Sequence, residues 1–208
     1  MALFDKPCLV DIDTQDDFVR PGGALYFPGA DEPIPIWKQL TDFGQSYRLP
    51  MIATMDCHTP EDPEFAQFPP HCVIGTGGQQ KISETLAVQH QLIQADQVDA
   101  TIDFESQVIV EKSTINIFEK SQAAVVFGAV QCSAFVVYGV ATEYCVKTAV
   151  LGLRERGYRV YVVSDAIRAF DPAAGERALA EMANAGAGFI QSATFFDKAH
   201  QQITARGQ

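Results

Sequence analysis

Short, almost wholly apolar runs alternate along the chain with longer stretches in which apolar residues recur at helical spacing. The predicted strands are Pro7–Asp13, Met51–Met55, Val108–Glu111, Phe135–Val140, Arg159–Ser164 and Gly188–Gln191. The predicted helices are Ile34–Tyr47, Thr142–Arg156 and Ala173–Ala185. Nearly continuous apolar strands that alternate with helices are typical of a parallel sheet covered on both faces. The pattern therefore predicts an α/β fold, a three-layer α-β-α sandwich around a central, mostly parallel sheet.

Composition and charge narrow the class of protein. The 208 residues are 47% hydrophobic and 20% charged, which is enough apolar content for a sizeable core. Since no repeat, low-complexity tract or linker interrupts the pattern, we expect residues 1–208 to form a single domain. The formal net charge of −11 argues against nucleic acid as a partner, because phosphate recognition needs a basic face.

The cysteines and the N-terminus bear on the compartment. The first residues lack the charged and apolar regions of a signal peptide. The longest apolar stretch, Ala134–Ala141, is far shorter than the roughly 20 residues that a membrane span requires. Five cysteines are an odd number in a chain too large to need disulfides. We therefore expect reduced thiols, no membrane association and a cytoplasmic location.

Candidate chemistry gathers where the predicted strands end, because ligands of parallel sheets bind beyond the carboxyl ends of the strands. The residues at these positions are Asp13, Asp56, Lys112 and Cys145. Each has an ordinary structural explanation when it is taken singly, as a cap, a loop organiser, a solvated lysine or a core thiol. Their convergence on one sheet edge favours a functional site.

Cys145 is the candidate nucleophile of this edge. It lies in the first turn of the helix predicted from Thr142, its candidate N-cap, where free N–H groups and the helix dipole favour a thiolate. A nearby Lys112 would lower the thiol pKa further, and Asp13 could accept the proton. The same N–H groups could bind an oxyanion. The alternative is a buried structural thiol, and the residues alone leave both open.

A second group of residues has the donor types of a metal site. Asp56 and His58 leave a predicted strand, and Glu64 and His71 follow in a proline-rich loop. Carboxylate and imidazole ligands suit a divalent transition metal. The spacing matches no common zinc-finger pattern, so a loop held by hydrogen-bonded histidines stays open as the alternative.

Taken together, these residues lie in blocks that resemble the isochorismatase-like cysteine hydrolases, and within them the nicotinamidases. The blocks are DTQDDF (13–18), PGGAL (21–25), MDCH (55–58), FPPHCVIGTGG (68–78), VEKS (110–113), GVATEYCV (139–146) and VVSDA (162–166). They follow one another in order over most of the chain, which makes the signal far more specific than any single block. The resemblance implies the isochorismatase-like, Rossmann-like form of the α/β fold.

The resemblance also implies an Asp-Lys-Cys triad. Cys145 would attack a carboxamide carbon, Asp13 would take the thiol proton and pass it to the departing ammonia, and Lys112 would hold both in register. The oxyanion hole would use the backbone N–H groups of Ala141 and Cys145, preceded by a non-proline cis peptide between Val140 and Ala141. The implied reaction is hydrolysis of nicotinamide to nicotinate and ammonia, a step of NAD salvage.

A bound metal is implied as well. Its ligands would be Asp56, His58 and His71, with Glu64 as the candidate fourth. Zinc is the first expectation, with iron or manganese as alternatives, and the ion would hold the pyridine nitrogen of the substrate. Phe18 and Phe68 would sandwich the planar ring.

Several alternatives remain open at this point. The chain could be another amide or carbamoyl hydrolase of the same superfamily, because the region between Lys112 and Gln131 diverges from the nicotinamidase pattern. It could be a non-catalytic binding protein on the same fold, or a hydrolase in which a metal-bound hydroxide is the nucleophile. The expected partner is a small-molecule amide. Relatives are commonly dimers or larger, so a homo-oligomer is an open option.

Overall fold

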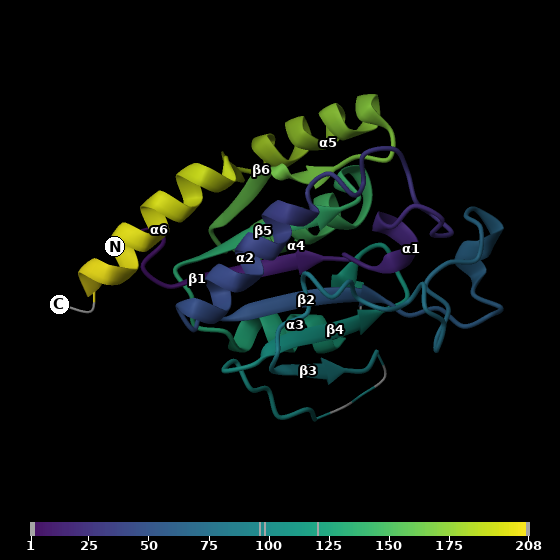
Figure 1. Ribbon diagram of the computed structural model, residues 1–208, viewed down its shortest axis with the longest axis horizontal. Coiled ribbons are helices and arrows are strands. Elements are labelled where there is room, and N and C mark those ends of the chain that lie inside the picture. The colour runs from purple at the N-terminus through teal and green to yellow at the C-terminus, as the bar shows by residue number, and fades with distance from the viewer. Residues whose placement is uncertain (1–2, 96, 98, 120, 207–208) are drawn as a thin grey trace.

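A twisted parallel sheet forms the centre of the molecule (Figure 1). The computed structural model describes residues 3–95, 97, 99–119 and 121–206. Within these residues the sheet has seven strands in the order β3-β4-β2-β1-β5-β6-β7, and every pairing is parallel. The strands are β1 (Pro7–Ile12), β2 (Met51–Asp56), β3 (His90–Ile93), β4 (Gln107–Lys112), β5 (Ala134–Val140), β6 (Val160–Arg168) and β7 (Gly188–Ile190).

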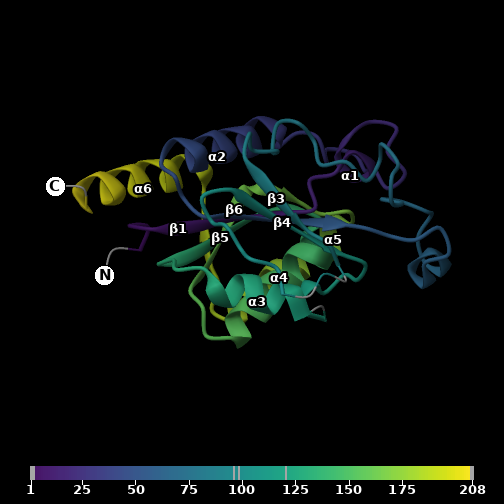
Figure 2. The same cartoon turned by 90° about the horizontal axis from the view of Figure 1, so that it is seen from below.

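Helices cover both faces of this sheet (Figure 2). The α-helices are α1 (Asp16–Val19), α2 (Ile34–Ser46), α3 (Ser121–Ala129), α4 (Lys147–Glu155), α5 (Pro172–Asn184) and α6 (Ser192–Arg206). Short turns of helix are η1 (Pro63–Ala66), η2 (Ile117–Glu119) and η3 (Thr142–Val146), the last of which is a π-helix. Helices α2 and α6 lie on one face, and α3, α4 and α5 lie on the other (Figure 2). The predicted α/β sandwich is confirmed, with a sheet that is wholly parallel in its described strands.

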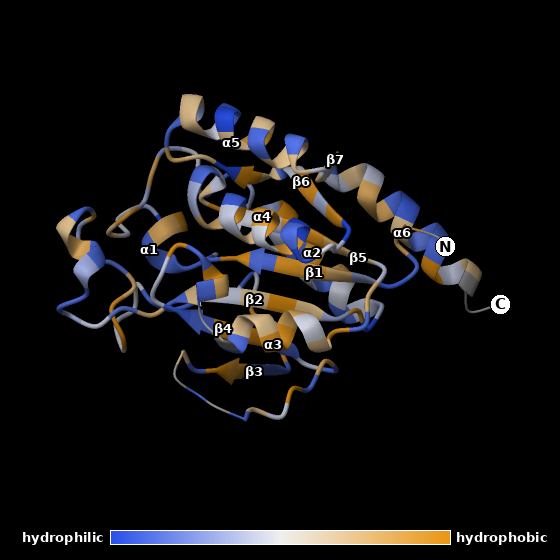
Figure 3. Cartoon of the chain, turned by 180° about the vertical axis from the view of Figure 1, so that it is seen from behind, coloured by the Kyte–Doolittle hydropathy of each residue, from blue (hydrophilic) through white to orange (hydrophobic). Residues whose placement is uncertain are grey.

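The strand residues explain the two hydrophobic layers. Successive side chains of a strand point to opposite faces, so Val10 of β1 packs with α3 and α4 while Leu9 packs with α2 and α6. Every residue of β1, β2, β4 and β5 is buried. The outer helices α5 and α6 alternate polar and apolar residues along their length, which is typical of helices with one face on a core (Figure 3).

The observed elements differ from the predicted ones in three ways. Strand β6 continues four residues beyond Ser164 to Arg168, because the register of β5 shifts at Gly139 and its last residues pair with Ile167 and Arg168. The edge strand β3 and the helices α1, α3 and α6 have no counterpart among the predictions. The helix expected from Thr142 begins as a π-helical turn before α4 continues it.

None of the helices that the structure describes is long and apolar enough to cross a membrane.

Candidate active site

The carboxyl ends of the central strands meet at one edge of the sheet. Strand β1 lies between β2 and β5, where the order of the strands along the chain reverses, and open α/β sheets bind ligands at such a point. Asp13 directly follows β1, and Cys145 lies five residues beyond the end of β5. Asp56 and Lys112 end β2 and β4 and stand opposite each other in the ladder. The structure thus brings together the four residues that the sequence singled out.

Asp13 is held by its own backbone and by the neighbouring strand. Its φ of 49° is left-handed, a conformation that aspartate adopts more readily than most residues. Thr54 of β2 accepts a hydrogen bond from the Asp13 N–H at 3.2 Å and donates its hydroxyl to Asp13 Oδ1 at 2.5 Å. The carboxylate is therefore fixed in orientation, with Oδ2 directed toward Lys112.

Lys112 links the other members of the group. Its Nζ lies 2.9 Å from Asp13 Oδ2, donates to Asp56 Oδ1, and lies 3.4 Å from Cys145 Sγ. The side chain is 1% exposed. A buried ammonium needs paired anions, and the two carboxylates supply them. Carboxylate oxygens of Asp13 and Asp56 and the sulfur of Cys145 all lie within 4.8 Å of one another.

Burial dominates the protonation of this group. It raises the pKa of Asp13, and the Lys112 ammonium opposes the rise. Burial also raises the pKa of Cys145 well above its ordinary value, with Lys112 again acting in the opposite direction. The expected lowering of the thiol pKa by Lys112 is therefore present but outweighed. The pKa of Lys112 itself is raised, since its two carboxylate neighbours outweigh burial. Such a thiol needs a base to remove its proton, and a carboxylate with a raised pKa is better suited to that role.

Two backbone features were expected beside Cys145, a cis peptide bond and a helix capped by Thr142. Only the first is present. The peptide bond between Val140 and Ala141 is cis, as the resemblance implied. The expectation that Thr142 caps the helix is wrong, because Ala141 occupies the N-cap position and no side chain caps it. The N–H groups of Tyr144 and Val146 both donate to the Ala141 carbonyl, at 3.1 and 3.2 Å. This π-helical turn carries Cys145 into the pocket lining beside Ala141.

Asp56, His58 and His71 form a second cluster next to this group. One donor atom from each lies within 4.8 Å of the others, and all three residues are buried. Asp56 Oδ2 is 3.9 Å from His58 Nε2, while Oδ1 of the same carboxylate accepts a hydrogen bond from Lys112 Nζ. His71 Nδ1 donates to the carbonyl of Pro69 at 2.9 Å, which leaves its Nε2 as an acceptor that lies 3.8 Å from Glu64 Oε1.

The donor set fits a divalent metal. Nε2 of His58 is buried and has no hydrogen-bond partner among the described residues, a rare condition that indicates a missing ligand or a special role. Asp62 Oδ2 lies 3.0 Å from His58 Nδ1, which is how carboxylates orient metal-binding histidines. Asp56, His58 and His71 could therefore hold the ion, with Glu64 beside them.

Protonation of the histidines differs. Burial lowers the pKa of His58, but the carboxylates of Asp56 and Asp62 outweigh it and raise the pKa to about 9. Burial lowers the pKa of His71 and raises that of Glu64. A cation among these groups would replace the proton of His58 as the partner of the carboxylates.

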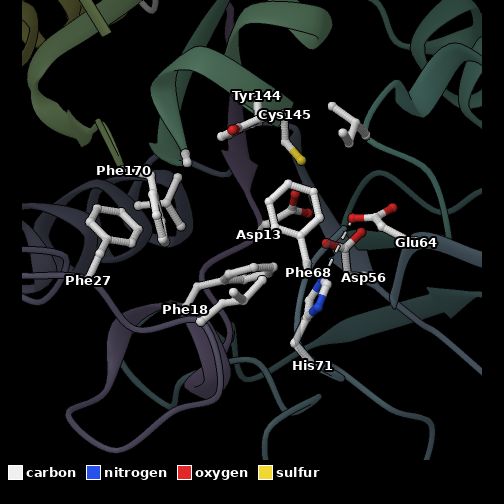
Figure 4. Close-up of a pocket in the computed structure, with 14 residues that line it drawn as sticks. Asp13, Phe18, Phe27, Asp56, Glu64, Phe68, His71, Tyr144, Cys145 and Phe170 are labelled. Carbon is white, nitrogen blue, oxygen red and sulfur yellow. Dashed lines mark ion pairs between the residues drawn. The ribbon is translucent and has the colours of Figure 1, made fainter. Parts of the chain in front are cut away.

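A pocket opens directly onto both clusters (Figure 4). Its lining residues are Asp13, Phe18, Leu25, Phe27, Asp56, Glu64, Phe68, His71, Ile115, Val140, Ala141, Tyr144, Cys145 and Phe170. The rings of Phe18 and Phe68 lie 5.4 and 6.3 Å from that of His71. Both aromatics that the sequence proposed thus line the pocket. An apolar cleft with a few convergent polar groups suits a small planar ligand.

Sequence reasoning missed several residues that hold the site in place. Gln15 accepts the N–H of Asp56 at 2.7 Å and donates to the carbonyls of Asp56 and Gln79, both at 2.8 Å. Asp17 accepts the N–H of Cys72 at 2.7 Å and thereby fixes the chain next to His71. The only signal in the sequence was their place in the DTQDDF block. The pocket residues Leu25, Phe27, Ile115, Tyr144 and Phe170 carried no chemical signal.

Comparison with known proteins gives the family of the chain. The chain matches the isochorismatase domain family over residues 7–194 and belongs to this family. It is 27% identical over 204 residues to the nicotinamidase of Escherichia coli (strain K12), covering 86% of this chain and 92% of that protein.

Solved structures give the same result. The pyrazinamidase of Pyrococcus horikoshii in complex with zinc is 29% identical, covers 89% of this chain and 99% of its own, and superposes with a TM-score of 0.71. The nicotinamidase/pyrazinamidase of Bacillus subtilis shares the fold at 21% identity, with 89% and 100% coverage and a TM-score of 0.75. These matches confirm the family that the sequence blocks indicated, and the chain is a hydrolase of the amidase class.

Proposed function

We propose that the protein is a metal-containing cysteine amidase that hydrolyses nicotinamide to nicotinate and ammonia. The observation that carries the proposal is the contact of Lys112 with Asp13, Asp56 and Cys145 at the floor of an aromatic pocket. The relatives named nicotinamidase and pyrazinamidase support the substrate class.

In the first half of the proposed reaction, Cys145 Sγ attacks the carboxamide carbon while Asp13 takes the thiol proton. The oxyanion that forms would accept hydrogen bonds from the N–H groups of Ala141 and Cys145. Asp13 then gives its proton to the nitrogen, the C–N bond breaks and ammonia leaves. The product of this half is a thioester on Cys145.

In the second half, water attacks the thioester carbon and Asp13 takes a proton from it. The C–S bond breaks, the thiolate recovers a proton from Asp13, and the product leaves as the carboxylic acid, which loses its proton to water to give nicotinate. Lys112 keeps Asp13 and Cys145 in register throughout, and its own raised pKa means that it remains an ammonium.

A divalent ion bound by Asp56, His58 and His71, with Glu64 as a candidate fourth ligand, would supply a Lewis acid that holds the pyridine nitrogen. Zinc is the first choice because the donors are imidazole and carboxylate and the Pyrococcus horikoshii relative is a zinc complex. Phe18 and Phe68 would flank the ring. Cys8, Cys72, Cys132 and Cys145 form no disulfide, as is usual for proteins of the reducing cytoplasm, where we place this step of NAD salvage.

The deciding experiment measures ammonia release from nicotinamide by purified protein of known metal content. Cys145→Ala and a chelated, remetallated sample are assayed beside it. The proposal is supported if Cys145→Ala is inactive and if the wild type loses its activity on chelation and recovers it when metal is added back. Activity that survives Cys145→Ser but not chelation would instead favour a metal-bound hydroxide as nucleophile. No release from nicotinamide overturns the substrate assignment and directs the assay to other amides and carbamoyl compounds.

A further inference from the structure

The pocket has an outer wall opposite the metal ligands. In Figure 4, Phe27 and Phe170 stand on one side of the pocket, and Asp56, Glu64 and His71 stand on the other. The rings of Phe27 and Phe170 are 5.2 Å apart and inclined by 56°. The two phenylalanines differ greatly in burial, since Phe27 is 3% exposed and Phe170 is 47% exposed. Phe170 is thus a half-open aromatic at the mouth of the pocket.

Phe170 lies on a short connection that its own side chain does little to hold. The connection joins the end of β6 at Arg168 to the start of α5 at Pro172. A side chain this exposed gains only part of the burial energy that fixes a core aromatic. Its position must therefore depend on how the backbone of the connection is held.

Glu143 holds that backbone. Its Oε1 accepts the N–H of Asp171 at 2.6 Å, and its Oε2 accepts the N–H of Phe170 at 3.1 Å. Glu143 is only 8% exposed, and hydrogen bonds from backbone N–H groups to a buried carboxylate are charge-assisted and strong. Because Glu143 lies two residues before Cys145 in η3, the same turn that carries the candidate nucleophile also carries this clamp.

We propose that Glu143 is a positioning residue that fixes Phe170, and that Phe170 limits which ring carboxamides enter the pocket. The inference rests on the proposed function for the orientation of the ring. In a pyridine-3-carboxamide, the nitrogen, the carbon that bears the carboxamide and ring carbon 5 point in three directions about 120° apart. With the nitrogen toward Asp56 and His71 and the carboxamide at Cys145, carbon 5 faces the Phe27–Phe170 wall.

The wall therefore selects for rings with no bulk at carbon 5. One methyl group too many in an apolar pocket changes kcat/KM by about 10- to 200-fold. We expect the wild type to prefer nicotinamide over 5-methylnicotinamide by at least about tenfold, the lower end of that range. Phe170→Ala removes the exposed half of the wall and should lower the ratio of the two kcat/KM values toward one.

Glu143→Gln tests the clamp, because a glutamine amide of the same shape presents an N–H₂ group to one of the two backbone donors. We expect the substrate ratio to fall toward that of Phe170→Ala. The double variant should be no less selective than Phe170→Ala alone, since the two residues act in series. A purely structural role of Glu143 in the Cys145 turn would lower kcat for both substrates equally and leave the ratio unchanged.

Hydrogen exchange gives a readout that does not depend on activity. Peptides that cover residues 169–174 should exchange faster in Glu143→Gln than in the wild type, because one of the two N–H groups loses its acceptor. Glu176→Gln is the matched control, since it makes the same charge change at an exposed position of α5. It should alter neither the exchange nor the substrate ratio.

The outcomes separate this inference from the proposed function. If the wild type releases no ammonia from nicotinamide, the proposed function fails while the exchange experiment still tests the clamp. If the wild type is active but Phe170→Ala leaves the ratio unchanged, Phe170 does not select and the proposal fails. If Phe170→Ala changes the ratio and Glu143→Gln changes neither ratio nor exchange, Glu143 is not the positioning residue.

Discussion

The two halves of the pocket are built in different ways. The nucleophile half consists of Asp13, Lys112 and Cys145. The metal half consists of Asp56, His58, Glu64 and His71. The first half comes from strand ends and the turn after a strand, whereas three of the four residues in the second come from the loop that follows β2.

The two halves differ in whether their polar groups have hydrogen-bond or ion-pair partners. In the nucleophile half, Thr54 and Lys112 occupy the two oxygens of Asp13, so the sheet and its neighbours fix the carboxylate. In the metal half, Nε2 of His58 is buried without a hydrogen-bond partner among the described residues. The sheet therefore holds Asp13, Lys112 and Cys145 in contact with one another. The loop after β2 instead holds donor atoms that a bound cation would complete.

The largest effect should come from removing the reacting groups. Cys145→Ala removes the proposed nucleophile and Asp13→Asn removes the proposed base, so each should lower turnover by at least about a thousandfold. Ammonia release measures the loss, and metal analysis checks that both variants still bind the ion. Metal content that falls together with turnover would show that the two halves are not independent.

Lys112 should matter for stability as well as for turnover. Lys112→Met leaves two buried carboxylates without their shared cation, and breaking a buried pair in this way costs about 3–5 kcal/mol. Urea unfolding of the ion-free protein measures the change. Turnover should fall with it, since Asp13 and Cys145 lose their common contact.

Lys81→Met is the matched control for Lys112→Met. Lys81 is also buried and pairs with Asp11 at 2.5 Å, but its side-chain partners Asp11 and Thr14 do not line the pocket, whereas Asp13, Asp56 and Cys145, the partners of Lys112, do. It should lower the free energy of unfolding and leave turnover within about tenfold of the wild type, as expected for a residue that touches no reacting group. Equal losses of turnover in both variants would contradict a special role for Lys112.

The contrast between the halves also explains which parts of the fold and of the site could be predicted from the sequence. Buried parallel strands are continuous apolar runs, so β1, β2, β4 and β5 were predicted nearly to their ends. Since residues that follow such strands must meet at one edge, the convergence of Asp13, Lys112 and Cys145 could be predicted too. The edge strand β3 was missed because only Ile93 of its four residues is buried, which leaves no apolar run.

Residues that support the site through contacts with loops could not be predicted. Asp62 orients His58, Gln15 holds Asp56 and Glu143 holds Phe170 through contacts that depend on the path of each loop. No periodicity encodes such a path. Helix α3 was missed for a related reason, since its sequence SQAAVVFGA is apolar nearly all round and gives no clear helical stripe.

A smaller effect is expected at the residue that orients His58. Asp62→Asn removes the charge that lies 3.0 Å from Nδ1 and should weaken metal binding about 10- to 100-fold, as such outer carboxylates do elsewhere. Competition with a chromogenic chelator measures the affinity. Glu61→Gln makes the same charge change at the exposed neighbouring position and should leave the affinity unchanged. An equal loss in both variants would mean that overall charge, and not orientation, is responsible.

The smallest effect concerns protons released when the ion binds. In the ion-free protein the pKa of His58 is raised to about 9, because the carboxylates of Asp56 and Asp62 outweigh burial. The pKa of His71 is lowered, so that residue is already neutral near pH 7.5. A cation that enters at pH 7.5 should displace about one proton, and its apparent affinity should fall about tenfold for each pH unit below 9.

The same shift has a consequence for the stability of the ion-free protein. A raised pKa in the folded state stabilises it fully below the unfolded value of about 6.5, and this contribution is lost as the pH rises through about 9.

Metal titrations by calorimetry in two buffers of different ionisation enthalpy count the protons released when the ion binds. Release of two protons would mean that His71 is also charged before binding. Release of none would mean that His58 is neutral, so that the carboxylates of the metal half need neither a proton on His58 nor a cation as partner.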